Sequence, residues 1–163
     1  MMKRLTAVVV VALLVVLLVG ACSSSDPGFE KRTMDAGAGS PIDVELVGSS
    51  QPMMMYMQGR ELPQQISFQF RVSNNSDEPL TVKKIMVYQR GVAAIQMETA
   101  LRGFDTTLEP GRDDTFTLNA LAKQLRPARQ GDDQEIVIRA EVTLTNGDTY
   151  VSSFEIPIGL AVQ

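Results

Sequence analysis

From Ile42 onward the chain repeats one pattern: short runs in which every second residue is apolar, separated by turn-forming residues. The clearest run is Ile66–Val72, where Ile, Phe, Phe and Val alternate with Ser, Gln and Arg. Successive side chains of a β-strand point to opposite faces, so such a run has one buried face and one solvated face. Further runs lie at Ile42–Leu46, Leu80–Val87, Ile136–Leu144 and Tyr150–Ile158. The pattern predicts antiparallel sheets.

Turn-forming residues stand where these runs must reverse. Asn74–Pro79 and Leu108–Gly111 are rich in Asn, Asp, Pro and Gly, and both predict turns. Asn146-Gly147 lies between two alternating runs and predicts a β-hairpin. The pair Lys83-Lys84 shifts the alternation by one residue, and a β-bulge there would explain the slip.

Two stretches are weaker or different. Ile95, Met97 and Leu101 suggest one further strand, and residues 115–118 suggest another short one. Leu118, Leu121 and Leu125 have helical spacing, Asn119 can cap a helix and Pro127 would end it. We therefore expect about seven strands and one short helix near 119–126. No internal repeat is visible.

This order of elements predicts an all-β fold, an antiparallel β-sandwich over residues 41–163. It resembles the immunoglobulin-like and fibronectin type III-like domains over roughly residues 42–160. The chain has no Trp and one Cys, so it lacks the core Trp and the Cys pair across the sheets seen in antibody domains. The resemblance concerns architecture, which does not specify function.

The first 22 residues have a different character. Lys3 and Arg4 precede an apolar run, Leu5–Val19, that only Thr6 interrupts, and small residues follow it. A basic start, an apolar core of this length and small residues at its end predict an export signal. The run falls short of the roughly 20 apolar residues that cross a bilayer comfortably. An uncleaved anchor helix remains the alternative.

The end of this segment, Val19-Gly20-Ala21-Cys22, resembles the lipobox of bacterial lipoproteins: an aliphatic residue, two small residues and a Cys. The resemblance implies that residues 1–21 are a signal peptide, and that Cys22 carries a diacylglycerol and becomes the first residue of the mature protein. At least two acyl chains would then anchor it stably to a membrane. A structural Cys behind an ordinary signal peptide is the alternative.

The residues after Cys22 predict a flexible tether over 22–40, because they are small, polar and without periodicity. In enteric-type bacteria an Asp after the lipidated Cys favours retention in the inner membrane. Ser23 stands there instead, so we expect the periplasmic face of the outer membrane if the host is Gram-negative.

Composition argues against several functions. The formal net charge is −4, whereas a nucleic-acid binder needs a basic surface. The chain has no His, which is the commonest general base and metal ligand. No Gly-x-Ser-x-Gly motif and no phosphate-binding glycine loop occurs. We therefore expect a protein that is not an enzyme and needs no cofactor.

The densest unusual cluster is a run of four methionines and one tyrosine: Met53, Met54, Met55, Tyr56 and Met57. Thioethers are soft ligands that favour Cu(I) or Ag(I), so the run could bind a soft metal ion. Exposed Met and aromatic side chains also suit an adaptable contact with another protein. Ordinary packing is the third alternative.

Acidic pairs occur at Asp113-Asp114 and at Asp132-Asp133, with Glu135 following the second pair. Carboxylates in loops could bind Ca²⁺, but the order of ligands found in calcium loops is missing, so solvated turns are the simpler interpretation. Arg126, Arg129 and Arg139 could pair with the second group.

Together these features predict a lipoprotein held to the membrane through Cys22, whose sandwich binds or scaffolds a protein partner in the cell envelope. The Met53–Met57 run is the expected contact. Soft-metal binding by the same run is the alternative function, and a small ligand in a pocket of the sandwich is a third.

Overall fold

The computed structural model describes residues 33–50, 62–91, 93–127 and 135–157, and those residues form strands, turns and loops without a helix. All of them belong to one structural unit. The strands are β1 (Thr33–Asp35), β2 (Ile42–Ser49), β3 (Gln64–Asn74), β4 (Leu80–Arg90), β5 (Ile95–Met97), β6 (Ala100–Leu108), β7 (Asp113–Gln124), β8 (Glu135–Leu144) and β9 (Thr149–Pro157).

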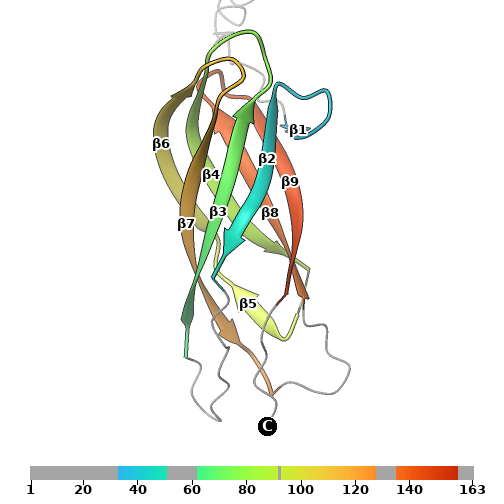
Figure 1. Ribbon diagram of the computed structural model, residues 1–163. Helices are drawn as coiled ribbons and strands as arrows, with labels where there is room; N and C mark the ends of the chain where they lie inside the picture. The colour runs from blue at the N-terminus through green and yellow to red at the C-terminus, as the bar shows by residue number, and fades with distance from the viewer. Residues whose placement is uncertain (1–32, 51–61, 92, 128–134, 158–163) are drawn as a thin grey trace, which may run out of the picture. The chain divides into compact units, whose positions relative to one another are not determined.

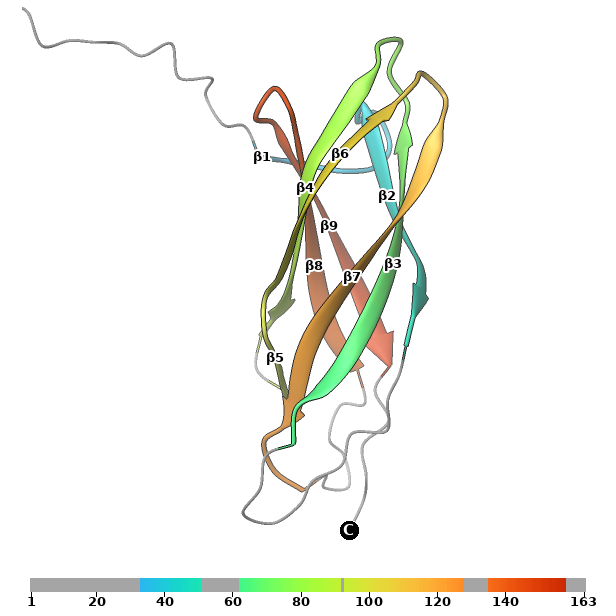
Figure 2. The same cartoon turned by 90° about the vertical axis from the view of Figure 1, so that its left-hand side faces the viewer.

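The strands form two sheets that pack face to face (Figure 1; Figure 2). One sheet has the order β2-β3-β7-β5, and the other has the order β1-β9-β8-β4-β6. All described neighbours are antiparallel except β1 and β9, which run parallel. Without β1, β5 and β6, the arrangement is β2-β3-β7 against β9-β8-β4, which is the order of the immunoglobulin-like sandwich. The predicted all-β sandwich is confirmed.

The two inner faces supply the core, as the alternation predicts. Phe68 and Phe70 on β3 are completely buried and are the largest of the fully buried side chains. Ile85 and Val87 on β4, and Ile138 and Val142 on β8, face them from the other sheet and are also fully buried. Because side chains fill the space between the sheets, the interior is a packed core.

The expected helix near 119–126 is wrong: residues 113–124 are strand β7, whose residues 113–122 pair with Gln64–Ser73 of β3. Its buried apolar residues are Phe116, Leu118, Ala120 and Ala122, at a spacing of two that buried Gln124 continues, whereas Leu121 is 44% exposed. The two alanines belong to the apolar face but are small, so the three leucines suggested a helical spacing instead. Pairing with a long neighbouring strand outweighs that weak local preference.

The stretch expected to hold one weak strand, Ile95 to Leu101, holds parts of two. β5 pairs with β7 in one sheet, and β6 pairs with β4 in the other, so the chain crosses between the sheets after Met97. This crossing and the additional strand β1 raise the number of described strands to nine, where about seven were expected.

The β-bulge predicted at the lysine pair is confirmed. The register of β4 shifts between Val82 and Lys84 against both β6 and β8. Lys83 points to solvent and pairs with Asp105, and Lys84 also avoids the core, so β4 lacks one inward side chain there. Phe104 of β6 is partly buried against the core, and its ring meets Phe116 edge-on at 4.9 Å.

The predicted turns are also confirmed. The β8–β9 hairpin closes with Gly147 N–H donating to Leu144 O at 3.1 Å and Leu144 N–H donating to Asp148 O at 2.9 Å. Gly147 has φ of 90°, a conformation that glycine adopts without strain. No described residue other than glycine has a positive φ, so at this turn Gly147 alone adopts the left-handed conformation.

The expected tether covers residues 22–40, but the structure places its last part, from Thr33 on, in the folded domain. Thr33–Asp35 form β1, which pairs with Thr149–Val151 of β9, and Ala36 N–H then donates to Val151 O at 2.9 Å. Met34 and Ala36 pack against the core. The folded domain therefore includes residues 33–40. The polar sequence of this segment does not indicate this, because backbone hydrogen bonds to a strand distant in the chain hold it in place.

Candidate functional site

The residues predicted to carry the function lie outside the described part of the chain. This holds for the predicted signal peptide, residues 1–21, for Cys22, and for the run Met53, Met54, Met55, Tyr56 and Met57. Lipidation of Cys22 and the role of the methionine run therefore stay predictions. Within the described ranges, no helix is long and apolar enough to span a membrane.

Of the acidic pairs, Asp132 and Asp133 also lie outside the described residues, whereas Asp113 and Asp114 begin β7. Arg71 on β3 lies between Glu45 on β2 and Asp113 on β7, at 3.2 Å and 3.4 Å. These side chains are about half exposed, so each ion pair stabilises the fold only slightly. In the described ranges, no three acidic, His or Cys side chains gather as a metal site would require.

Sequence reasoning missed Asn74, which is fully buried at the end of β3. Its Nδ2 donates to Glu78 O and Leu108 O, both at 2.8 Å. Its Oδ1 accepts from Ser76 N–H at 2.9 Å and from the Ser76 hydroxyl at 2.7 Å. Asn74 therefore joins the β3–β4 turn to the end of β6, and its role is structural.

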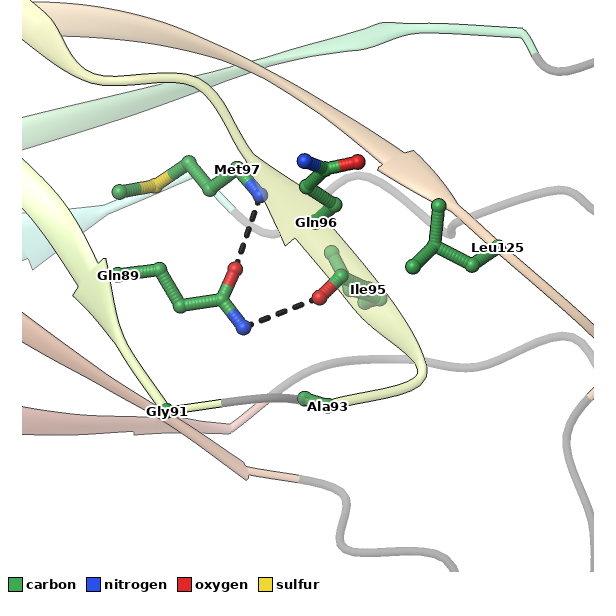
Figure 3. A pocket seen from close by; sticks show the side chains of 7 residues that line it. All are labelled: Gln89, Gly91, Ala93, Ile95, Gln96, Met97 and Leu125. Atoms are coloured by element: carbon green, nitrogen blue, oxygen red, sulfur yellow. Dashed lines mark hydrogen bonds between the residues drawn. The ribbon is translucent and has the colours of Figure 1, made fainter.

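At the opposite end of the sandwich, a cavity of about 310 Å³ lies between β4 and β5. Figure 3 shows Gln89 reaching from β4 toward the backbone of β5. Gln89 Nε2 donates to Ile95 O at 3.0 Å, and Met97 N–H donates to Gln89 Oε1 at 2.9 Å. The amide thus acts as a ladder partner that joins the two sheets. The sequence offers one sign of this role: Gln89 follows Ile85 and Val87 at the same spacing of two, so a polar side chain stands at an inward position.

On the outer face of the second sheet, the Tyr88 hydroxyl donates to Glu141 Oε1 at 2.8 Å. Burial raises the pKa of Tyr88, and the hydrogen bond to Glu141 and its negative charge raise it further. The tyrosine therefore stays protonated at neutral pH and acts as a donor that joins β4 to β8.

A second hollow, of about 460 Å³, lies on the side of the sandwich where β9 borders β2. It is lined by Leu46 of β2, Val137 of β8, and Ser153, Phe154 and Glu155 of β9. Phe154 is partly buried against the core and its ring meets Phe70 at 5.7 Å, whereas Ser153 and Glu155 are exposed. This hollow combines apolar side chains with a strand edge, and it is the candidate binding site among the described residues.

Comparisons with known proteins add little to this description. No family model matches the chain, and no curated protein matches it. Among solved structures, it is similar to a FixG-related protein from Vibrio parahaemolyticus, with 11% identity and a TM-score of 0.38 over 73% of this chain and 97% of that one. It is also similar to a conjugative transposon lipoprotein from Bacteroides eggerthii, with 15% identity and a TM-score of 0.34 over 71% of this chain and 96% of that one. At such TM-scores neither likeness carries an argument about function.

Proposed function

We propose that this protein is a lipid-anchored lipoprotein of the bacterial cell envelope whose β-sandwich binds or scaffolds another envelope component without catalysing a reaction. The observation that carries the proposal is the lipobox-like Val19–Cys22, followed closely by a folded domain. β1 begins at Thr33, eleven positions after Cys22. The covalent chain between Cys22 and Thr33 caps the distance from lipid to domain at roughly 40 Å. The domain would work close to the membrane surface.

The binding role is supported by how the sandwich uses its residues. Its inner faces are filled by the core, so a partner would have to bind at a strand edge, an outer face or an end. Gln89 and Asn74, the polar side chains that reach inward at the two ends, hold the fold together through backbone hydrogen bonds. The side hollow beside β9 offers apolar contact and a strand edge together.

The proposed location is the periplasmic face of the outer membrane in a Gram-negative host, because Ser23 rather than Asp follows the lipidated residue. The test is the variant Cys22→Ser, with Ser24→Ala as the matched control. We expect incorporation of labelled palmitate and recovery in the membrane fraction to be lost in Cys22→Ser and kept in the control. Label retained by Cys22→Ser would contradict the lipid anchor.

The binding role is tested by crosslinking in intact cells, followed by pull-down of the native lipoprotein. A parallel strain carries Ser in place of Met53, Met54, Met55 and Met57. A specific partner lost in that strain would place the contact in the methionine run. A partner kept there would support the binding role with its contact elsewhere, and the lack of any partner would count against the binding role.

A further inference from the structure

The edge of β9 is only partly occupied by the described strands. β1 pairs with Thr149–Val151, and Ala36 N–H donates to Val151 O. No described strand pairs with the outer edge of β9 beyond Val151, while its other edge pairs with β8 as far as Pro157. Residues 152–157 therefore present one edge without a strand partner among the described residues.

The backbone polarity of that edge follows from strand geometry. Val151 O points away from β8, because it accepts from Ala36, and Leu144 N–H bonds Asp148 O on the β8 side. Backbone groups alternate in direction along a strand, so those of Ser153 and Glu155 face the same open edge as those of Val151. A row of N–H and C=O groups at this spacing is complementary to an extended polypeptide.

The hollow beside β9 lies where an added strand would run. It touches Phe154, which packs toward the core, and also Ser153 and Glu155, which point away from it. Because its lining residues belong to both faces of β9, the hollow reaches the edge of that strand, and Val137 of β8 shows that it also extends over the outer face of the sheet. Leu46 of β2 borders it and is partly buried against the core, so the inner side of the hollow is apolar.

On the opposite side of the sandwich, in contrast, one charged side chain bridges the two sheets. There Arg102 of the edge strand β6 donates from Nη1 to Thr117 O of β7 at 3.0 Å and lies over the Phe104 ring at 5.1 Å. Phe104 and Phe116 fill the space between those two strands. Charged side chains that cover an edge are a common protection against unwanted strand pairing. Residues 152–155 carry one charged side chain, Glu155, and among the described residues no hydrogen bond or ion pair ties it across the edge.

β1 shows what kind of chain this edge accepts. It is an extended three-residue segment with one partly buried apolar side chain, Met34, against the core. We propose that the remaining edge, Ser152–Glu155, binds an extended segment of a partner protein as an added β-strand. This inference rests on the proposed binding function and names the chemistry of the partner. Alternate apolar side chains of that segment would face Leu46 and Phe154.

The charge at this edge further restricts the expected sequence of the partner segment. Glu155 is the charged side chain that lines the hollow, and it is exposed. Opposite charges on neighbouring strands favour pairing, and like charges oppose it. The partner segment should therefore carry Lys or Arg, rather than Asp or Glu, at the outward position beside Glu155.

The test measures binding of synthetic peptides to the full chain in detergent. The probe peptide alternates Val with Thr and Lys, and the comparison peptides are a version of the same composition with the valines grouped, one with Glu for Lys, and one N-methylated at alternate residues. We expect the alternating peptide to bind best, and N-methylation to weaken binding roughly tenfold because it removes main-chain donors.

The protein variants are Ser153→Pro and its matched control Ser153→Ala. Proline removes the N–H that faces the open edge and leaves the pairing with β8, whereas alanine keeps that N–H. We expect Ser153→Pro to weaken binding roughly tenfold and Ser153→Ala to change it by less than about twofold. Should Ser153→Pro fail to fold, Glu155→Pro against Glu155→Ala repeats the comparison, and the N-methylated peptide needs no variant.

Several results would overturn the inference. The first is that the grouped or the N-methylated peptide binds as tightly as the alternating peptide, and the second is that Ser153→Pro and Ser153→Ala bind it equally. A dimer that Ser153→Pro converts to monomer would assign the edge to a second copy, and peptide binding only after deletion of 158–163 would assign it to this chain's own C-terminal segment.

A cellular partner that crosslinks equally to Ser153→Pro would overturn the inference and leave the proposed function standing. Peptide binding through this edge without any cellular partner would support the inference and count against the proposed function.

Discussion

Asn74 lies fully buried at the end of β3, where its side chain makes four hydrogen bonds that join separate parts of the chain. Two of them reach the backbone carbonyls of Glu78 and Leu108. Removal of the amide leaves the carbonyl oxygen of Leu108 without this donor, and a buried polar group without a hydrogen bond lowers the stability of the fold. We expect Asn74→Ala to lower the free energy of unfolding by about 3 kcal/mol, measured by urea denaturation.

The neighbouring residue Asn75 supplies the control. It is exposed, and its backbone N–H, which donates to Pro41 O at 2.8 Å, is unaffected by a change of side chain. Asn75→Ala should change the free energy of unfolding by less than about 0.5 kcal/mol. Equal losses in the two variants would show that turn preference, and not the buried hydrogen bonds of Asn74, is the important property.

Tyr88 and Tyr150 link stability to alkaline pH. Burial raises the pKa of both phenols, with further contributions from Glu141 at Tyr88 and from the charge of Asp148 at Tyr150. A pKa raised by folding stabilises the folded state below pH about 10, and this stabilisation is lost as pH rises through the folded pKa. We expect the free energy of unfolding to fall above pH about 10, and to fall less in Tyr88→Phe. Urea denaturation at several alkaline pH values, with phenolate absorbance, measures both.

An identical alkaline loss in wild type and Tyr88→Phe would contradict this assignment. The comparison is between slopes with pH, because Tyr88→Phe also removes the hydrogen bond to Glu141 at every pH.

At the scale of the element, β7 shows how strand pairing overrides a local helical spacing. Leu118 is buried on the inner face, whereas Leu121 is 44% exposed on the outer face. A helix that used both leucines would lose stability on truncation of either. In the strand, Leu118→Ala should cost about 2–4 kcal/mol and Leu121→Thr less than about 0.5 kcal/mol, measured by urea denaturation. A large loss at Leu121 would contradict the strand.

The bulge in β4 also shows how far local sequence predicts a strand and what depends on a neighbouring strand. The phase slip at Lys83-Lys84 is visible in the sequence, because alternation is a local property of a strand. Phe104, which packs against the core where the register shifts, comes from β6. Nothing near the lysines in the sequence points to it, because the match depends on register between strands.

At the scale of the whole molecule, the short strand β1 joins the N-terminal end of the domain to its last strand. Thr33–Asp35 pair with Thr149–Val151, and Met34 contacts the core. Replacement of Thr33–Asp35 by Gly-Ser-Gly should lower the free energy of unfolding by about 1–2 kcal/mol, because it removes the apolar contact of Met34 and weakens the ladder. It should also speed hydrogen exchange at the Ala36 amide, which mass spectrometry measures.

The control replaces Asp26–Gly28, within the part of the expected tether that lies outside the described residues, by the same three residues. That change should leave both the unfolding free energy and the Ala36 exchange rate close to wild type. Comparable effects from the two replacements would mean that the pairing of β1 does not stabilise the domain.

The site follows the same division. The lipobox and the methionine run were found from sequence because they are contiguous motifs, and they stay predictions here. The candidate hollow could not be predicted, because Leu46, Val137 and Phe154 come from three strands and meet only once the sheets have packed. In the sequence, Ser153 and Glu155 look like ordinary outward residues of a strand. Their edge is open among the described residues because the pairing of β1 with β9 ends at Val151.

By itself, the sequence determined which residues form most strands and which face each strand buries, because alternation and turn chemistry act over a few residues. It likewise placed the Lys83-Lys84 bulge and the turn at Gly147. Tertiary structure decided that residues 119–124 extend a strand, that Thr33–Asp35 join β9, and which edges stay open. Those outcomes depend on partners distant in the chain, whose backbone hydrogen bonds and packing outweigh weak local preferences.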